Sequence, residues 1–222
     1  MNGVLYAVGV GPGDPELLSL KAVRILDQAD VIACPAKDGA HGLAFQIAAR
    51  ACPAIETKEI LPLTFPMRDG EQTAAHREAA ARIISVLRTG KSVAFLTLGD
   101  PGFYSTFSHV AEAVKEEGFD IEIISGVPSF AAVLAALRSP AAVGKEPVLI
   151  TAGEFRDFDG TLIILKAGVG LKALKDAVAA AGRSACLVEN YALPGQHIYP
   201  DLPSMPDMAG YFSILVVRPA PK

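Results

Sequence analysis

Two acidic residues in glycine-rich turns are the side chains whose spacing most clearly suggests chemistry. Asp14 lies in GVGPGDP at residues 9–15, and Asp100 lies in LGDPGF at residues 98–103. A glycine-rich turn that leads from a strand into a helix often binds phosphate, because the helix presents free backbone N–H groups. Here the Asp14 carboxylate is expected at the helix N-cap, with Pro15 as the first helical residue. The turn therefore favours a ligand without a phosphate.

A third small-residue loop, SGVPSF at residues 125–130, also joins an expected strand to an expected helix. Ligands of open α/β sheets bind at the carboxyl ends of parallel strands. Three such loops predict a pocket lined by backbone amides and carbonyls, whose charged groups are carboxylates. That lining suits a ligand with a cationic centre and with amino and hydroxyl groups. The first loop taken alone is equally consistent with an ordinary tight turn.

Nucleotide-binding motifs fit the first loop poorly. A dinucleotide fingerprint needs G-x-G-x-x-G, but the glycines stand at positions 9, 11 and 13, so the third comes too early. No acidic residue stands at the end of the second expected strand, in VIACPAK, where one would hold a ribose. No Lys-Ser or Lys-Thr pair closes the loop as in a P-loop.

The elements that must position these loops follow from hydrophobic periodicity. Strands are expected at residues 4–10, 30–34, 59–67, 91–100, 120–126, 146–153, 161–168, 184–190 and 211–219. Helices are expected at residues 15–29, 42–52, 70–90, 107–118, 128–139 and 170–182. Several strands of the second half follow one another without helices, so that sheet should be mixed. The sequence therefore predicts two α/β domains, 1–120 with a mainly parallel sheet and 121–222 with a mixed sheet.

Composition narrows the class of protein. The chain has 222 residues, is 51% hydrophobic and carries a net charge of −4, which argues against a nucleic-acid binder with a basic surface. Cys34, Cys52 and Cys186 form no CxxC pair and are expected as reduced cytosolic thiols. The four histidines lack metal-ligand spacing, so no metal site is expected. No signal core or apolar run of membrane-spanning length is found, and we expect a soluble cytoplasmic protein.

The three loops also carry a family resemblance. VGVGPGDPELLSLKAVRIL, LGDPGFYST and SGVPSF resemble the tetrapyrrole methylases, which use S-adenosylmethionine to methylate corrin and sirohaem precursors. LPLTFPM, GDPGFYSTF and ENYALPGQHIY are most similar to the branch that methylates C20 of precorrin-2 or cobalt-factor II in cobalamin biosynthesis. The resemblance spans essentially the whole chain. It implies a homodimer, and a cofactor folded into the cleft between two α/β domains.

Matched residue by residue, the resemblance implies a set of cofactor contacts. They are Pro12, Leu98, Gly99, Asp100, Phe103, Ser105, Thr106, Pro128, Ser129, Leu165 and Lys166. Pro128 stands where relatives have a hydroxyl side chain, and Leu165–Lys166 stands where many have methionine. A last contact is expected near residues 211–213.

The resemblance further implies an in-line transfer of a methyl group from a sulfonium to an electron-rich meso carbon. The leaving group is neutral S-adenosylhomocysteine, so the main task is orientation and exclusion of water. Asp100 is expected to orient the amino-acid end of the cofactor or to accept the meso proton, unless it only caps a helix. Tyr104 is expected to stack on or hydrogen-bond to the macrocycle, unless it only packs in the loop.

The substrate would carry many carboxylates, which basic groups bind. The candidates are Arg68, Lys37, His41, Lys145 and Lys166, each of which is alternatively a solvated surface charge. Precorrin-2 and cobalt-factor II both stay open as substrates, as does another acceptor of the same family. A nicotinamide-dependent oxidoreductase and a non-catalytic binding module are the alternatives from other classes.

Overall fold

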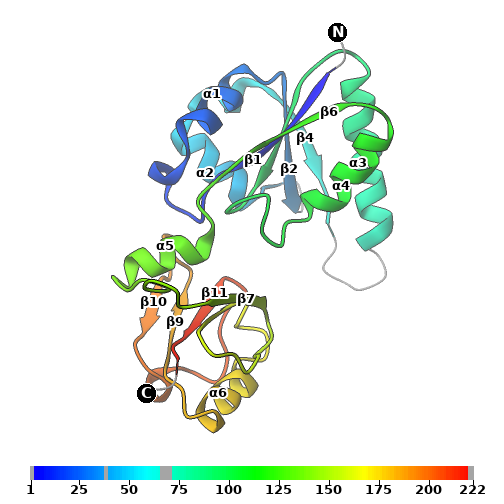
Figure 1. Ribbon diagram of the computed structural model, residues 1–222. Coiled ribbons are helices and arrows are strands. Elements are labelled where there is room, and N and C mark those ends of the chain that lie inside the picture. The colour runs from blue at the N-terminus through cyan, green and yellow to red at the C-terminus, as the bar shows by residue number, and fades with distance from the viewer. Residues whose placement is uncertain (1–2, 38–39, 66–71, 220–222) are drawn as a thin grey trace. The chain divides into compact units, whose positions relative to one another are not determined.

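The computed structural model describes residues 3–37, 40–65 and 72–219, and divides into two compact units, Met1–Pro128 and Ser129–Lys222 (Figure 1). Each unit has its own sheet, its own helices and its own cores on both faces of the sheet.

The division falls after Pro128, whereas the sequence predicts a boundary after residue 120. The difference arises from strand β6 (Asp120–Ile124), which pairs in parallel with β1 (Val4–Gly9) and so belongs to the first sheet. A boundary at residue 120 would separate β6 from the strand to which it is hydrogen-bonded.

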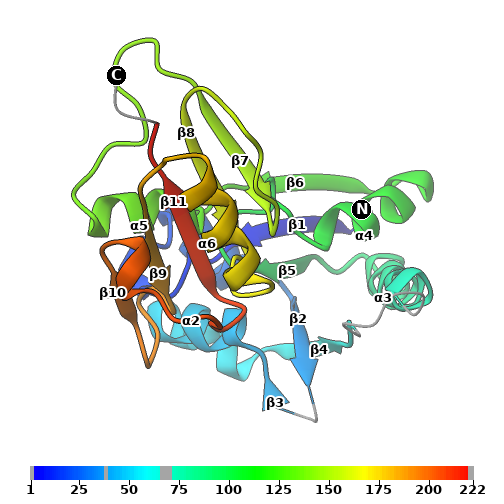
Figure 2. The ribbon, with the colours of Figure 1, turned by 90° about the horizontal axis from the view of Figure 1, so that it is seen from below.

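The first sheet has the order β3-β2-β5-β1-β6, with β4 paired to β2. Its further strands are β2 (Val31–Lys37), β3 (Ala40–His41), β4 (Glu59–Leu63) and β5 (Val93–Thr97). All pairs are parallel except the short β2–β3 pair, which confirms the predicted parallel sheet. Figure 2 shows β2, β5, β1 and β6 side by side, so the loops that follow β1, β5 and β6 leave the same edge.

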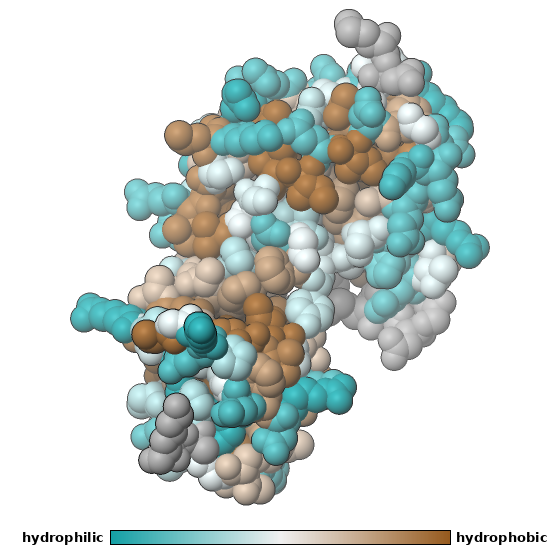
Figure 3. Space-filling model, in the orientation of Figure 1, coloured by the Kyte–Doolittle hydropathy of each residue, from teal (hydrophilic) through white to brown (hydrophobic). Residues whose placement is uncertain are grey.

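Helices cover both faces of this sheet, which explains why its strands are apolar throughout. Leu5 and Ala7 of β1 face one core, and Val8 and Val10 face the other, as the two-residue period of a strand requires. Helices α1 (Leu20–Gln28) and α2 (Leu43–Ala51) pack on the Val8 side, and α3 (Gln72–Leu87) and α4 (Phe107–Glu116) pack on the Leu5 side (Figure 1). Figure 3 shows hydrophilic side chains over α3 and α4 and apolar ones along the β6 edge.

The second sheet is mixed, as the sequence predicts. Its order is β10-β9-β11-β8-β7, with β7 and β8 parallel and the remaining pairs antiparallel. The strands are β7 (Val148–Ala152), β8 (Thr161–Leu165), β9 (Ala185–Glu189), β10 (His197–Tyr199) and β11 (Ser213–Val217). Helix α6 (Leu171–Ala180) covers one core and α5 (Ser129–Ala136) the other.

The structure contains several short elements that were not expected from the sequence. The strands β3 and β10 and the 3-10 helices η1 (Pro15–Leu17), η2 (Pro53–Thr57) and η3 (Leu202–Ser204) were not expected. Elements of two to five residues lack a hydrophobic period long enough to detect.

Candidate functional site

The first two glycine loops are joined through their backbones beyond the ends of β1 and β5. The Gly11 N–H donates to the Gly99 carbonyl at 3.2 Å, and the Gly99 N–H donates to the Gly11 carbonyl at 2.8 Å. Both residues have a φ of 74°, in the left-handed region that favours glycine. Two loops that follow parallel strands thus turn back and pair with each other.

The third loop is in close contact with the other two. A Cβ on Gly9 would lie 2.6 Å from the Gly126 nitrogen and 2.7 Å from the Gly99 oxygen. A Cβ on Gly126 would overlap that same oxygen and lie 2.8 Å from the Gly9 carbonyl carbon. These separations are shorter than side-chain contacts allow, so the three loops meet backbone to backbone.

Asp100 links the second loop to the third. Its Oδ1 accepts the Gly102 N–H at 2.7 Å, and its Oδ2 accepts the Gly126 N–H at 3.0 Å. The N-cap residue of α4 is Thr106, so Asp100 caps a turn and not that helix. A carboxylate has about four acceptor positions, and Asp100 keeps capacity to accept further donors.

The first loop closes with two caps in succession. Asp14 is the N-cap of η1 and accepts the Glu16 N–H at 2.9 Å, with Pro15 as its first residue. Helix α1 begins later than expected, because Ser19 is its N-cap and accepts the Ala22 N–H at 3.1 Å. The Asp14 carboxylate thus occupies the amide position where a phosphate would bind in a dinucleotide site.

Ser19 also contributes a contact between loops. Its hydroxyl donates to the Ser125 carbonyl at 3.3 Å, which connects the start of α1 with the loop after β6. No sequence pattern predicts this contact. It joins residues 106 positions apart in the chain.

The second loop carries exposed aromatic side chains. Phe103 is 44% exposed and Tyr104 is 53% exposed, and Tyr104 has a φ of 49°. The Ser105 hydroxyl accepts the Phe107 N–H at 3.1 Å and lies 3.3 Å from the Thr97 hydroxyl. Ser105 therefore ties the loop to β5 and to the first turn of α4.

The remaining expected cofactor contacts lie at element ends. Pro12 is buried in the first loop, and Leu98 packs against the core beside α1 and α2. Ser129 begins α5. Leu165 ends β8, and Lys166 follows with a φ of 56° and its Nζ 5.4 Å from the centre of the Tyr211 ring.

The expected substrate-binding cations are described only in part. Arg68 lies outside the described residues, as do the side chains of Lys37 and His41, whose backbones belong to β2 and β3. Lys145 is exposed in the turn before β7. Their roles toward a substrate stay predictions.

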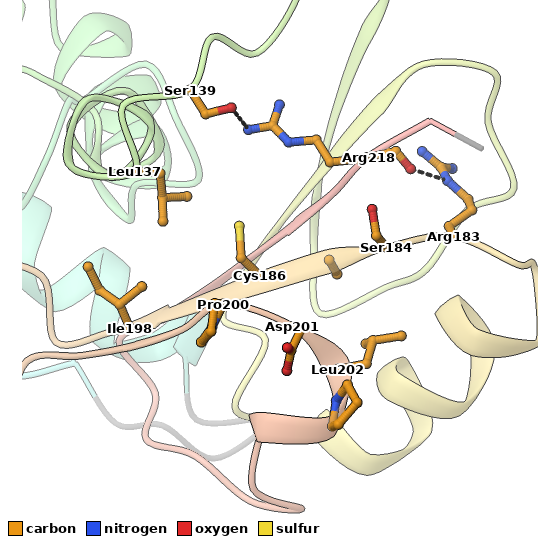
Figure 4. A pocket seen from close by; sticks show the side chains of 12 residues that line it. Leu137, Ser139, Arg183, Ser184, Cys186, Ile198, Pro200, Asp201, Leu202 and Arg218 are labelled. Atoms are coloured by element: carbon orange, nitrogen blue, oxygen red, sulfur yellow. Dashed lines mark hydrogen bonds between the residues drawn. The ribbon is translucent and has the colours of Figure 1, made fainter. Parts of the chain in front are cut away.

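A pocket of about 480 Å³ lies in the second unit (Figure 4). Arg183, which is 6% exposed, donates to the carbonyls of Arg218 at 2.8 Å and Phe158 at 2.9 Å, and to that of Gly160. Arg218 donates to the Ser139 hydroxyl at 2.6 Å. The guanidinium groups at this pocket are thus engaged in hydrogen bonds that connect separate segments of the second unit. We therefore assign the candidate ligand site to the glycine loops.

The described residues contain neither a membrane-spanning helix nor a metal-binding group of side chains. Among residues 3–37, 40–65 and 72–219, no helix is long and apolar enough to cross a membrane. Within the same ranges, no group of three or more His, Cys, Asp and Glu side chains is placed to hold a metal ion.

Comparison with known proteins gives a family match and named relatives. Residues 4–204 match the family described as Tetrapyrrole (Corrin/Porphyrin) Methylases. The chain is 38% identical over 169 residues to the "Probable cobalt-precorrin-2 C(20)-methyltransferase" of Methanocaldococcus jannaschii, covering 73% of this chain and 71% of that protein. It is 32% identical to the "Cobalt-precorrin-2 C(20)-methyltransferase" of Salmonella typhimurium, covering 98% and 97% of the two chains.

Solved structures share the fold along nearly the whole chain. A uroporphyrin-III-C-methyltransferase from Thermus thermophilus is 26% identical, with a TM-score of 0.71 over 99% of this chain and 93% of that one. A uroporphyrin-III C-methyltransferase structure from the same organism, complexed with S-adenosylhomocysteine, is 19% identical, with a TM-score of 0.69 over 97% of both chains.

Proposed function

This chain belongs to the tetrapyrrole (corrin/porphyrin) methylases, and we propose that it transfers a methyl group from S-adenosylmethionine to the C20 meso carbon of precorrin-2 or cobalt-factor II. The transfer is a step of cobalamin biosynthesis and leaves S-adenosylhomocysteine. The names of relatives that are 38% and 32% identical support this substrate position.

The observation that carries the proposal is the joined cluster of three glycine loops. None of residues 9–18, 96–107 and 125–130 is Lys or Arg, so the loops oppose no cationic ligand by charge. Side chains are excluded where the loops touch, which leaves backbone amides and carbonyls as the polar lining. These features fit S-adenosylmethionine, whose sulfonium is positive and whose groups besides the base are hydrogen-bonding amines, hydroxyls and a carboxylate.

The residues that would hold this cofactor come from both units. In the first unit they are Pro12 and the loop from Leu98 to Thr106, and in the second they are Ser129, Leu165 and Lys166. Pro128, the last residue of the first unit, precedes them.

S-adenosylmethionine supplies an electrophilic methyl group whose leaving group is a neutral thioether, so no acid is needed to expel it. The chain must hold the reactants in line and keep water away from them. Asp100 accepts the Gly102 and Gly126 N–H groups, which supports a role for its fixed carboxylate in orienting the amino group of the cofactor. The exposed ring of Tyr104 offers a flat surface to a macrocycle.

One assay tests the reaction. The protein is incubated with methyl-labelled S-adenosylmethionine and with precorrin-2 or cobalt-factor II, and the new methyl group is located by mass spectrometry and NMR. We expect label at C20 with one of the two substrates. Label at another corrinoid position would replace C20 by a different acceptor of the same family.

Equilibrium binding distinguishes the other classes of function. We expect calorimetry to show binding of S-adenosylhomocysteine and none of NAD, because Asp14 occupies the amides that a pyrophosphate needs. Binding of NAD alone would indicate an oxidoreductase. Cofactor binding without methylation of any tetrapyrrole would indicate a binding module.

We further propose that the protein acts in the cytoplasm as a homodimer. Free thiols at Cys34, Cys52 and Cys186 support a reducing compartment. The dimer is suggested by the family resemblance, and light scattering on the purified protein tests it directly.

A further inference from the structure

Two histidines on neighbouring helices of the first unit stack on each other. His76 is in α3 and His109 is in α4, and their ring centroids are 4.7 Å apart with 13° between the planes. The ring of Phe65, which follows β4, lies 5.6 Å from that of His76. Helices α3 and α4 pack directly against each other (Figures 1 and 2).

The pair belongs to the edge of the sheet that carries the glycine loops. His109 is in the first turn of α4. Its backbone N–H donates to the carbonyl of Thr106, the last residue of the second loop, at 3.3 Å. His76 is in the second turn of α3, the helix that follows the carboxyl end of β4. Both imidazoles therefore lie close to where their helices leave the edge that we assign to the ligand.

The ring nitrogens of the pair have no polar partner in the part of the chain that the structure describes. Neither imidazole makes a hydrogen bond or an ion pair with another residue that the structure describes. His109 is exposed, and His76 is half-buried. Each imidazole can donate from a ring N–H, so the pair can serve an acceptor with two oxygens.

The charges around the pair also matter for its protonation. Burial lowers the pKa of His76, and the neighbouring charge of His109 lowers it further. The charged residues nearby in the chain are Arg77 and Glu78 on α3, Glu112 on α4 and Asp100 of the second loop, which also carries the neutral phenol of Tyr104. None of them forms an ion pair with either histidine in the described part of the chain. An anion placed against both rings would offset their mutual repulsion and favour their charged forms.

We infer that His76 and His109 together bind a carboxylate of the tetrapyrrole substrate. This assignment rests on the proposed function, because only that function brings a polycarboxylate to this edge. Protonated imidazoles donate charge-assisted hydrogen bonds to a carboxylate, and binding then strengthens as the pH falls. A metal site is the poorer explanation, since no third ligand accompanies the pair among the described residues.

The test uses uroporphyrin, a porphyrin whose peripheral side chains all end in carboxylates, and measures its affinity by fluorescence titration without turnover. We expect His109→Gln and His76→Gln each to weaken uroporphyrin about tenfold near pH 6, the effect of losing a hydrogen bond to a charged group. We also expect the affinity of the wild-type protein to rise between about pH 8 and about pH 6, and that rise to vanish in the double variant.

The control is His197→Gln, which removes an exposed imidazole that contacts the ring of Tyr199 in the second unit. It should leave the uroporphyrin affinity unchanged. Unchanged affinity for S-adenosylhomocysteine in all variants will show that they fold. Equal uroporphyrin affinity in the wild-type protein and the double variant would overturn the inference and make the stack structural. A fall in kcat with unchanged uroporphyrin affinity would overturn it in favour of proton transfer.

The proposed function is tested separately by labelled methyl transfer in the wild-type protein. If that transfer fails, the proposed function fails, whatever the histidine variants do. If it succeeds and the variants bind uroporphyrin normally, only the inference about the histidines fails.

Discussion

The two units hold their loops in different ways. In the first unit, the loops meet backbone to backbone at Gly9, Gly99 and Gly126, with one carboxylate bridging them. In the second unit, long cationic side chains reach across gaps to backbone carbonyls. Arg183 donates to three carbonyls, and the Lys175 Nζ donates to those of Met205 at 2.8 Å and Pro206 at 3.2 Å.

The difference follows from strand direction. Parallel strands end at one edge, so the loops after β1, β5 and β6 emerge together and can pair directly. Neighbouring antiparallel strands end at opposite edges, so the loops that follow β9 and β11 leave the second sheet from opposite edges and do not gather at one edge. A ligand that binds backbone atoms is therefore best served by the first arrangement. Changes in the backbone contacts of the first unit should affect ligand binding, and changes in the long cationic side chains of the second unit should affect stability.

The largest effect is expected from Gly126→Ala, which places a methyl group where the three loops touch. The new Cβ would overlap the Gly99 oxygen, and backbone atoms on both sides leave it no room. The loops must separate, so we expect affinity for S-adenosylhomocysteine, measured by calorimetry, to fall about 100-fold or more. Gly118→Ala is the control, since that glycine has a φ of 80° with no atom near its Cβ position. It should cost about 1 kcal/mol of stability and leave affinity unchanged.

Arg183→Met should show the opposite pattern in the second unit. The methionine fills similar space but leaves the carbonyls of Arg218, Phe158 and Gly160 without their donor. We expect the free energy of unfolding in urea to fall by about 3 kcal/mol. Affinity for S-adenosylhomocysteine should stay within about twofold under native conditions.

Arg156→Met is the control, because it removes only an exposed ion pair with Glu154 and should cost less than about 0.5 kcal/mol of stability. Equal losses in the two variants would contradict a fastening role for Arg183.

Asp100→Ala tests whether the bridging carboxylate acts on the ligand. Its loss leaves the Gly102 and Gly126 N–H groups without their acceptor and removes the expected partner of the cofactor amino group. We expect affinity for S-adenosylhomocysteine to weaken about tenfold, with a smaller loss in Asp100→Asn, which keeps one oxygen. Asp201→Ala removes a comparable cap, on the Ser204 N–H in the second unit, and should cost about 1 kcal/mol of stability without a change in affinity. Unchanged affinity in Asp100→Ala would restrict that residue to closing its turn.

Local signals in the sequence predicted much of the fold. The parallel and mixed sheets follow from the spacing of apolar runs and helical patterns, and the three loops follow from Gly, Pro and Asp at strand ends. Asp14 caps a helix with Pro15 as its first residue, as predicted, but that helix is the short η1. Helix α1 starts at Leu20 because Ser19, and not Asp14, is its N-cap. Asp and Ser are both favoured N-cap residues, so the sequence alone did not decide which of the two begins α1.

Contacts between distant residues were beyond the reach of such signals. The bond from the Gly126 N–H to Asp100 joins residues 26 positions apart, and the stacked His76 and His109 come from different helices. Arg183 was not singled out, because a lone arginine at the end of a helical pattern is usually a surface charge. Each of these contacts depends on which strands become neighbours, and hydrophobic period alone does not specify strand order.

The smallest expected effect concerns the amino edge of the first sheet, where side-chain hydrogen bonds connect the segments that precede two strands. Asp30 precedes β2 and Ser92 precedes β5, and the Asp30 Oδ2 accepts the Ser92 N–H at 2.8 Å and the Ser92 hydroxyl at 2.7 Å. These hydrogen bonds lower the pKa of Asp30. A lowered pKa in the folded state means that the ionised carboxylate stabilises the fold above about pH 4, and that this contribution is lost as the pH falls through the folded-state pKa.

Ser92→Ala should therefore reduce the free energy of unfolding by about 0.5 kcal/mol near pH 7, a modest value because Asp30 is largely exposed to solvent. The gap between the variant and the wild-type protein should narrow towards pH 2, as the carboxylate becomes protonated. Ser108→Ala is the control, because that hydroxyl donates to the Ser105 carbonyl at 3.0 Å and its loss involves no titrating group. A gap of the same size at both pH values would show that the Ser92 hydroxyl acts without the charge of Asp30. Affinity for S-adenosylhomocysteine should not change in either variant. Side-chain hydrogen bonds would then stabilise the sheet at its amino edge, while the backbone contacts at its carboxyl edge hold together the proposed ligand site.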